Sequence, residues 1–199
     1  MYCKGVPKIV DHEQRRTEII HALWQVIYEQ GIHAASYQAV ARAAGISVGR
    51  IQHYFASKQD LVRAGCQAIV DTAESVHFGR TEALEPFDAL TELLTQPIPR
   101  NNAFRLGTAV WYAYLAQAVA DPQIMEIVTK ACRETLDYAA GLLKQAGAPA
   151  QEAERLIALS NGLAQAAMVG AVTVEEAARV LHQEAGATEA AVHRRFEVV

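Results

Sequence analysis

Residues 48–50 form a short run whose chemistry suits contact with DNA bases. The guanidinium group of Arg50 can donate two hydrogen bonds to guanine O6 and N7, the commonest base-specific contact in the major groove. Val48 can pack on a thymine methyl group, and Gly49 has no side chain, which would let the backbone approach DNA closely. Gln52 can reach a base or a phosphate. These residues predict a base-reading helix.

Other residues around this run are suited to holding the phosphate backbone. Ser36 and Tyr37 stand at a predicted helix start, whose free N–H groups attract an anion. Tyr54 offers a hydroxyl group. Lys58 stands in the first turn of another predicted helix, where a cation opposes the helix dipole unless a phosphate lies between them. The complete predicted DNA-contacting set is Ser36, Tyr37, Ser47, Val48, Gly49, Arg50, Gln52, His53, Tyr54 and Lys58.

Two short helices around a glycine turn would position these side chains. Ser36 can cap the first, which Gly45 ends, and Ile46 is expected to be buried in the turn. Ser47 can cap the second, whose buried face would carry Ile51 and Phe55 at i and i+4. This is the layout of a helix-turn-helix DNA reader.

Two further helices are predicted on either side of this pair. Ser57 and Asp60 resemble a capping box at the start of the later helix. The earlier helix is expected from about Asp11 to Gly31, and its apolar face follows the i, i+3, i+4, i+7 spacing of Ile20, Leu23, Trp24 and Ile27. Because these local signals agree with one another, they carry more weight than any one of them.

Some of these residues also allow an ordinary structural interpretation. Arg50 could be a solvated arginine on an arbitrary helix, and Tyr54 could belong to the core or to the surface. His53 next to Tyr54 could suggest acid–base chemistry, but no nucleophile or acidic partner stands at a useful spacing. A solvated histidine is the simpler interpretation.

Charged side chains divide unevenly along the chain. Residues 1–63 carry eight basic against five acidic side chains, a net charge of +3, and the remainder carries ten against seventeen, a net charge of −7, which together give the −4 of the whole chain. A basic N-terminal part would be attracted to phosphate while the acidic remainder would be repelled. A hydrophobic fraction of 51% over 199 residues is ample for one large or two small packed domains.

The sequence predicts neither a metal site nor a cofactor. Cys3, Cys66 and Cys132 form no CxxC pair, and the seven histidines show no HxxxH or HExxH spacing. No apolar run approaches the roughly 20 residues that cross a bilayer, and residues 1–10 lack the pattern of a signal peptide. We therefore expect a cytoplasmic protein without a membrane partner.

The chain after Leu61 is predicted to be helical almost throughout, because no segment shows the sustained alternation of a strand. Asp121 followed by Pro122 is a cap with proline at the first helical position, and Thr173 with Glu176 resembles a second capping box. The tail at 186–199 is ambiguous. Helices are expected from Leu61 to about Phe78 and at 85–94, 104–119, 122–147, 149–170 and 173–185, with a proline-containing loop at 95–102.

Residues 13–62 resemble the N-terminal domain of the TetR family of transcriptional regulators. The chain departs from the family at Gln52, where many members carry tyrosine, and this puts the usual tyrosine–phosphate contact in doubt. The run GRIQHYF at 49–55 is similar to the subgroup that includes the choline-responsive betaine-pathway repressor. The residues that carry the family resemblance are Ser36, Val40-Ala41, Ala44-Gly45-Ile46-Ser47, Gly49, Ile51, His53 to Phe55, Lys58 and Leu61.

The resemblance implies two domains in an all-α chain. A three-helix helix-turn-helix DNA-binding domain would occupy residues 1–62, and a helical ligand-binding and dimerisation domain would occupy residues 63–199. A homodimer would be joined mainly by the last two long helices. The alternative is that the helix at 149–170 is simply the core of the monomer. Its apolar residues occupy more than one face, namely Leu156, Ile157, Leu159, Leu163, Ala167 and Met168.

The resemblance also implies a pocket for an unknown small-molecule effector. Aromatic residues at helical spacing are more often core than pocket lining. An aromatic cage for a quaternary ammonium group is one conceivable form of this pocket. The residues available to line it are Phe104, Arg105, Trp111, Tyr112, Tyr114, Tyr138 and Asn161, with Asn102 as a further polar candidate.

Together these observations predict a ligand-responsive regulator, a repressor that binds a palindromic double-stranded operator as a dimer and is released by a small molecule. Two alternatives stay open from the sequence. A helical adaptor could bind a protein partner through the apolar surface assigned to the dimer. A small helical enzyme would need convergent titratable groups, and residues 63–199 show none at motif spacing.

Overall fold

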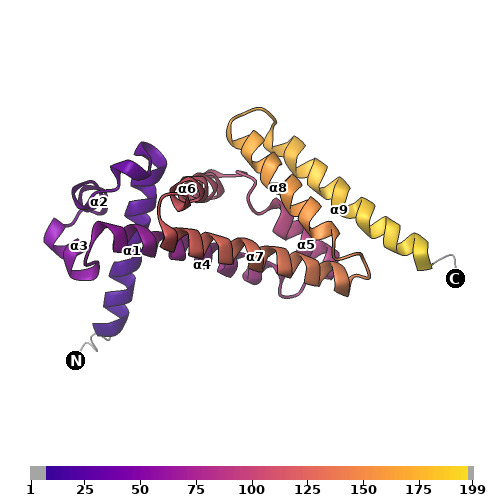
Figure 1. The fold of residues 1–199 in the computed structure, drawn as a ribbon, viewed down its shortest axis with the longest axis horizontal. Coiled ribbons are helices and arrows are strands. Elements are labelled where there is room, and N and C mark those ends of the chain that lie inside the picture. Colours follow the sequence, from indigo (N-terminus) through magenta and orange to yellow (C-terminus); the bar gives the residue numbers. More distant parts are fainter. Residues whose placement is uncertain (1–7, 197–199) are drawn as a thin grey trace, which may run out of the picture. The chain divides into compact units, whose positions relative to one another are not determined.

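The described part of the chain contains only helices and their connections in this computed structural model, which confirms the expected all-α fold (Figure 1). The structure describes the backbone of residues 8–196 and the side chains of residues 12–77 and 79–191. Cys3 lies outside the described residues. The helices are α1 (Lys8–Gln30), the 3-10 helix η1 (Ile32–Ala34), α2 (Tyr37–Ala44), α3 (Val48–Tyr54), α4 (Lys58–Thr81), α5 (Pro86–Thr95), α6 (Asn102–Ala118), α7 (Pro122–Gln145), α8 (Glu152–Met168) and α9 (Val174–Phe196).

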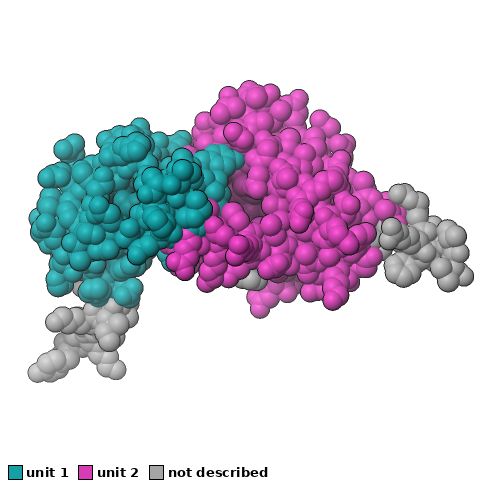
Figure 2. Space-filling model, viewed as in Figure 1, with its two compact units in different colours: residues 1–69, 110–125 teal, residues 70–109, 126–199 magenta. Residues whose placement is uncertain are grey.

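The chain divides into two compact units (Figure 2). The first unit consists of Met1–Ile69 and Val110–Met125, and the second consists of Val70–Ala109 and Glu126–Val199. Helices α4, α6 and α7 therefore each contribute residues to both units. The predicted division into a DNA-binding domain (1–62) and a ligand-binding and dimerisation domain (63–199) is one of function, whereas these two units are defined by packing. The functional division stays a prediction.

Apolar residues of α1 form the centre of the first unit. This helix begins at Lys8, three residues before the expected Asp11, and Gly31 follows its end with a φ of +82°. The indole N–H of Trp24 donates a hydrogen bond to the Gly65 carbonyl oxygen at 3.0 Å, which joins α1 to α4. The predicted apolar face is confirmed, since none of its four residues is more than 6% exposed: Ile20, Leu23, Trp24 and Ile27.

Residues 110–125 join the first unit partly through an ion pair. Arg63 of α4 donates two hydrogen bonds to Asp121, with Nε–Oδ2 at 3.1 Å and Nη2–Oδ1 at 3.2 Å. The same carboxylate caps α7, because Oδ1 accepts the backbone N–H groups of Gln123 and Ile124 at 3.0 and 3.3 Å. The cap predicted from the Asp-Pro pair is thus confirmed, and it also binds a partner 58 residues away in the sequence.

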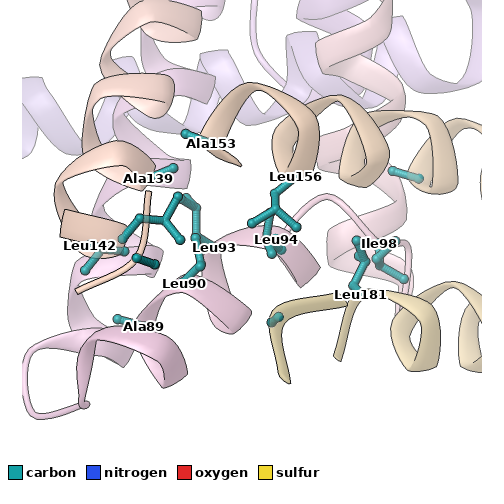
Figure 3. Packing of buried hydrophobic residues seen from close by; sticks show 14 of the residues in the cluster. Ala89, Leu90, Leu93, Leu94, Ile98, Ala139, Leu142, Ala153, Leu156 and Leu181 are labelled. Atoms are coloured by element: carbon teal, nitrogen blue, oxygen red, sulfur yellow. The ribbon is translucent and has the colours of Figure 1, made fainter. Parts of the chain in front are cut away.

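The second unit is built around leucine and alanine side chains of α5, α7, α8 and α9 (Figure 3). The Ser160 hydroxyl of α8 donates to the Leu94 carbonyl oxygen at 2.6 Å, which satisfies a polar group inside this apolar core. Truncating one of these buried leucines to alanine would cost about 2–5 kcal/mol. Five leucines of the cluster are fully buried: Leu90, Leu94, Leu143, Leu156 and Leu181.

The last helix begins as predicted and ends later. The Thr173 hydroxyl accepts the Glu176 N–H at 3.1 Å, and the Glu176 carboxylate accepts the Thr173 N–H at 2.9 Å, so the capping box is complete. α9 then continues past the expected end at Ala185 to Phe196. Gly186 lies inside the helix without a positive φ, and the alanine-rich residues that follow favour its continuation.

Two other helix ends differ from the prediction by about one turn. α4 ends at Thr81 rather than near Phe78, since no capping residue interrupts it earlier. α8 begins at Glu152 rather than at Pro149, because Pro149 opens a turn in which its carbonyl oxygen accepts the Glu152 N–H at 3.1 Å. Within the described residues, no helix is long and apolar enough to cross a membrane.

Candidate nucleic-acid interface

Gly45 turns the chain between α2 and α3. Its φ of +66° lies in the left-handed region, where a side chain would add strain. Its N–H donates to the carbonyl oxygens at the end of α2, and the Ile46 N–H donates to the Ala41 oxygen at 3.0 Å. Ile46 is half-buried rather than buried, because it lies at the edge of the turn. The predicted helix-turn-helix is present.

Serine side chains cap both short helices, as predicted. Ser36 Oγ accepts the Ala39 N–H at 3.2 Å, and Ser47 Oγ accepts the Arg50 N–H at 3.3 Å. Each cap satisfies one N–H group that a helix start leaves free. The cap at Ser47 therefore fixes the backbone of Arg50, the residue assigned to base contact.

α3 has a buried and an exposed face. Ile51 is 0% exposed and Phe55 is 3% exposed. The Arg16 guanidinium lies 5.2 Å from the centre of the Phe55 ring and covers it. On the exposed face of α3 lie the polar side chains of Arg50, Gln52 and His53. Gly49 is exposed as well, whereas Val48 and Tyr54 are half-buried. The exposed edge thus carries groups that can donate hydrogen bonds to DNA.

The residues assigned to phosphate contact border this edge. The Tyr37 hydroxyl donates to the Phe55 carbonyl oxygen at 2.9 Å and so ties α2 to the end of α3. Burial, and secondarily the charge of Asp60, raise the pKa of Tyr37. Its hydroxyl therefore has a structural role, while its N–H at the start of α2 stays available to an anion. Lys58 is exposed in the first turn of α4, which Ser57 caps by accepting the Asp60 N–H at 3.0 Å.

α1 adds residues that the sequence analysis did not assign to this surface. The His12 ring centre lies 4.6 Å from that of Tyr54, and the His53 ring meets Tyr54 edge-on at 5.3 Å. Arg15 lines a shallow hollow together with Arg50 and Tyr54. The neighbouring basic residues Arg15 and Arg16 could have suggested contact with phosphate. No local pattern, however, links α1 to a helix about 40 residues later in the chain.

The seven residues assigned to an effector pocket fall into both units. In the first unit, Tyr114 is fully buried, and burial raises the pKa of its hydroxyl well above the ordinary value. In the second unit, the Tyr138 ring meets that of His77 at 5.2 Å. Their part in ligand binding stays a prediction. Trp111, Tyr112 and Tyr114 belong to the first unit, and Phe104, Arg105, Tyr138 and Asn161 belong to the second.

Comparisons with known proteins agree with this geometry. A family model for bacterial regulatory proteins of the tetR family matches residues 19–64, and one for the C-terminal part of BetI-type transcriptional repressors matches residues 86–188. The chain belongs to the TetR family. The HTH-type transcriptional regulator PksA of Bacillus subtilis (strain 168) is 31% identical over 178 residues, which cover 86% of this chain and 87% of that protein.

Three further similarities extend over most of the chain. The HTH-type transcriptional regulator BetI of Escherichia coli (strain UTI89) is 29% identical over 167 residues, covering 79% of this chain and 84% of that protein. A transcriptional regulator of Rhodococcus sp. Rha1 shares the fold with a TM-score of 0.79 at 25% identity, over 87% of this chain and 95% of that one. A Saccharomonospora viridis regulator solved with choline has a TM-score of 0.79 at 21% identity, over 86% of this chain and 95% of that one.

Membership of the TetR family favours a transcriptional regulator over the adaptor and the enzyme that the sequence left open. The chain is a DNA-binding transcriptional regulator with a helix-turn-helix, and it is not an enzyme. Among the described residues, no group of three or more His, Cys, Asp or Glu side chains is placed to hold a metal ion.

Proposed function

We propose that this TetR-family regulator is a repressor that binds a palindromic operator as a homodimer and is released by a small-molecule effector. The exposed edge of α3 carries the proposal. Arg50 is exposed there in the first turn of a capped helix whose opposite face is fully buried at Ile51. A recognition helix of a helix-turn-helix presents its N-terminal side chains to base edges in this way.

The N-terminal residues of α3 would read bases while their neighbours hold the backbone. Arg50 would bind a guanine in the major groove, and Val48 would pack beside it on a thymine methyl group. The N–H groups at the start of α2 and the Lys58 ammonium group would bind phosphates on the flanking strands. Gln52 would replace the family's usual tyrosine with an amide that can reach either a base or a phosphate.

The dimer would form through α8 and α9. The outward face of α8 carries small or uncharged residues at i, i+4 and i+7, which allow close helix approach: Ala158, Gly162 and Gln165, all exposed. A β-carbon at Gly162 would meet nothing within 4 Å. Four further apolar residues of α8 are only half-buried within their own unit, namely Ile157, Leu159, Leu163 and Met168. Two copies would place two α3 helices on the half-sites of one palindrome.

Release would follow from a population shift. An effector lowers operator affinity only if it binds better to a conformer whose recognition helices are wrongly spaced for the two half-sites. α4 contributes Lys58 to the DNA-binding unit and continues into the second unit, so it is the element that would transmit the change. The choline complex of the Saccharomonospora viridis regulator supports a small molecule as the signal.

Operator binding is tested by selecting duplexes from a random library with the full chain and measuring affinity by fluorescence anisotropy. We expect Arg50→Ala to cost about 1–3 kcal/mol and to relax preference at one base position. Lys58→Ala should weaken all duplexes alike and reduce the slope against salt by about one. The exposed α7 variants Arg133→Ala and Lys130→Ala are the matched controls. If Arg50→Ala and Lys58→Ala both bind the selected duplex with the affinity of the parent, this mode of DNA binding is refuted.

A further inference from the structure

Two arginines of the second unit converge on one carboxylate and one aromatic ring. Arg80 at the end of α4 lies 3.4 Å from Glu92 of α5, measured from Nη1 to Oε2. Arg100, in the loop between α5 and α6, lies 3.9 Å from the same oxygen, measured from Nη2. The two guanidinium groups also lie 5.3 and 4.1 Å from the centre of the Phe104 ring. Segments from three parts of the chain thus bring two positive charges to one place.

The Glu92 carboxylate neither balances the charge of both arginines nor accepts a hydrogen bond from every N–H group of Arg100. Arg100 Nη2 is buried, and within the described part of the chain no acceptor lies at hydrogen-bond distance from it. Burial, and secondarily the charge of Arg80, lower the pKa of Arg100, and the opposing effect of Glu92 is smaller. The charged form of Arg100 is therefore under-compensated, and a second anion would relieve the cost.

The loop holds Arg100 in a fixed position. Its backbone N–H donates to the Ile98 oxygen at 2.8 Å, and Ile98 is 1% exposed. Asn101 Oδ1 then caps α6 by accepting the N–H groups of Ala103 and Phe104 at 3.0 and 3.1 Å. Hydrogen bonds fix the backbone on both sides of Arg100. A ligand that binds Arg100 would therefore lose little free energy to ordering of the loop.

We propose that Arg80 and Arg100 bind the carboxylate group of a small molecule, with the planar guanidinium of Arg100 donating to it. The side chains of Arg80 and Arg100 are 45% and 28% exposed, so a ligand can reach the exposed part of each, while Nη2 of Arg100 stays buried behind it. Two guanidinium groups against one carboxylate leave a single positive charge, which matches a monocarboxylate rather than a phosphate dianion. Calling this ligand the effector rests on the proposed function, but its binding here does not.

His77 does not change this charge balance. It lies within electrostatic range of Glu92, but burial outweighs that carboxylate and lowers the pKa of the imidazole. The lowered pKa favours the neutral form of the ring. The site offers its ligand the charge of the two arginines beside the half-buried Phe104 side chain, which suits a carboxylate joined to an apolar or aromatic group.

The first test titrates the full-length protein with benzoate by isothermal calorimetry. We expect Arg100→Gln and Arg80→Gln to weaken benzoate binding by about tenfold, because each removes a charge-assisted contact. Arg133→Gln, an exposed arginine of α7 in the same unit, should bind benzoate like the parent. Circular dichroism shows whether each variant is folded. No benzoate binding to the parent, or parental binding by both folded arginine variants, would overturn the proposal.

The variant Glu92→Gln distinguishes a ligand site at Arg80 and Arg100 from a cluster with a structural role alone. At a carboxylate site, Glu92 competes with the ligand, so its removal should strengthen benzoate binding by about threefold or more. If Arg80, Glu92 and Arg100 served only as a brace, the Gln variant would weaken or leave unchanged any benzoate binding. Inorganic phosphate or choline binding more tightly than benzoate at the same residues would also count against a monocarboxylate.

The outcome is separable from operator binding. The calorimetric titration contains no DNA, and Arg100→Gln leaves the α3 surface unchanged. If the parent binds an operator but does not bind benzoate, the carboxylate site is refuted and the proposed function is unaffected. Benzoate binding with the expected variant pattern, but no selected duplex, would support the site and refute the DNA docking.

Discussion

Gly65 lies where α4 packs against its neighbours in the first unit. A β-carbon there would come within 2.5 Å of both Leu23 Cδ2 and the Tyr114 hydroxyl oxygen. The leucine methyl group can move, but Tyr114 is fully buried and has little room. The Gly65 carbonyl oxygen also accepts the Trp24 indole N–H, so a backbone shift would strain that hydrogen bond. This glycine is required by space rather than by its φ.

We therefore expect Gly65→Ala to lower the free energy of unfolding by about 1–3 kcal/mol through overpacking. Chemical denaturation monitored by circular dichroism measures it. Gly79→Ala in the same helix is the matched control, since its β-carbon would meet nothing within 4 Å. That control should be neutral or slightly more stable, because alanine favours the helix. Equal stability of Gly65→Ala and the parent would contradict the packing described here.

The Arg63–Asp121 pair predicts a dependence of stability on pH. Burial favours the neutral carboxyl group, but the Arg63 hydrogen bond, the N–H groups of Ile124 and Gln123, and the Arg63 charge together hold the pKa of Asp121 below its ordinary value. Since the folded pKa is depressed, this stabilisation is present above the unfolded pKa of about 4. It should be lost as the pH falls through the folded pKa.

Asp121→Asn isolates the charge, because asparagine still caps a helix start. We expect it to cost about 2 kcal/mol at pH 7 and to flatten the loss of stability below about pH 4. Urea titrations at pH 3 to 7 measure both effects. The conservative variant Asp121→Glu keeps the charge and serves as the comparison. Parallel stability curves for the parent and Asp121→Asn would show that the ion pair contributes nothing.

At the scale of elements, the short helix α3 depends on its cap. α3 has only seven residues, so its first turn cannot rely on a long helix for support. Ser47→Ala should cost about 1 kcal/mol of stability and weaken operator binding, because Arg50 loses its fixed backbone position. Ser47→Asn restores a neutral cap and should recover the stability. The prediction fails if the alanine variant matches the parent in both anisotropy and denaturation.

Helix ends were predictable where a side chain or a left-handed glycine sets them. Ser36, Ser47, Asp121 and the Thr173–Glu176 box all cap as expected, and Gly45 turns the chain with a positive φ. The ends of α4 and α9 carry no such signal. There the helix continues until tertiary packing and local propensity no longer favour it, and neither quantity can be read from a short window of sequence.

At the scale of the whole molecule, the sequence could not show which distant residues meet. Residues 110–125 belong to the first unit, yet nothing local marks Asp121 as the partner of Arg63. The aromatic pocket candidates were chosen by residue type, and they divide between the units for the same reason. The pair Arg80 and Arg100 was missed because arginines 20 positions apart, in a helix and a loop, form no motif.

The proposed dimer makes the last prediction at this scale. Ala158 is exposed on the outward face of α8, so Ala158→Arg should leave the folded protomer intact while preventing close approach of two copies. We expect the parent to sediment as a dimer of the 21.7 kDa chain and the variant as a monomer with unchanged helix content.

Operator affinity of the variant should fall by at least about tenfold, because two linked half-site contacts become independent. Ala116→Arg, at an exposed alanine of α6, is the matched control and should stay dimeric. Sedimentation velocity at micromolar concentration and anisotropy with the selected duplex measure the two quantities. A dimeric Ala158→Arg with parental affinity would place the dimer contact elsewhere than on α8. A monomeric variant with parental affinity would mean that one recognition helix suffices for binding.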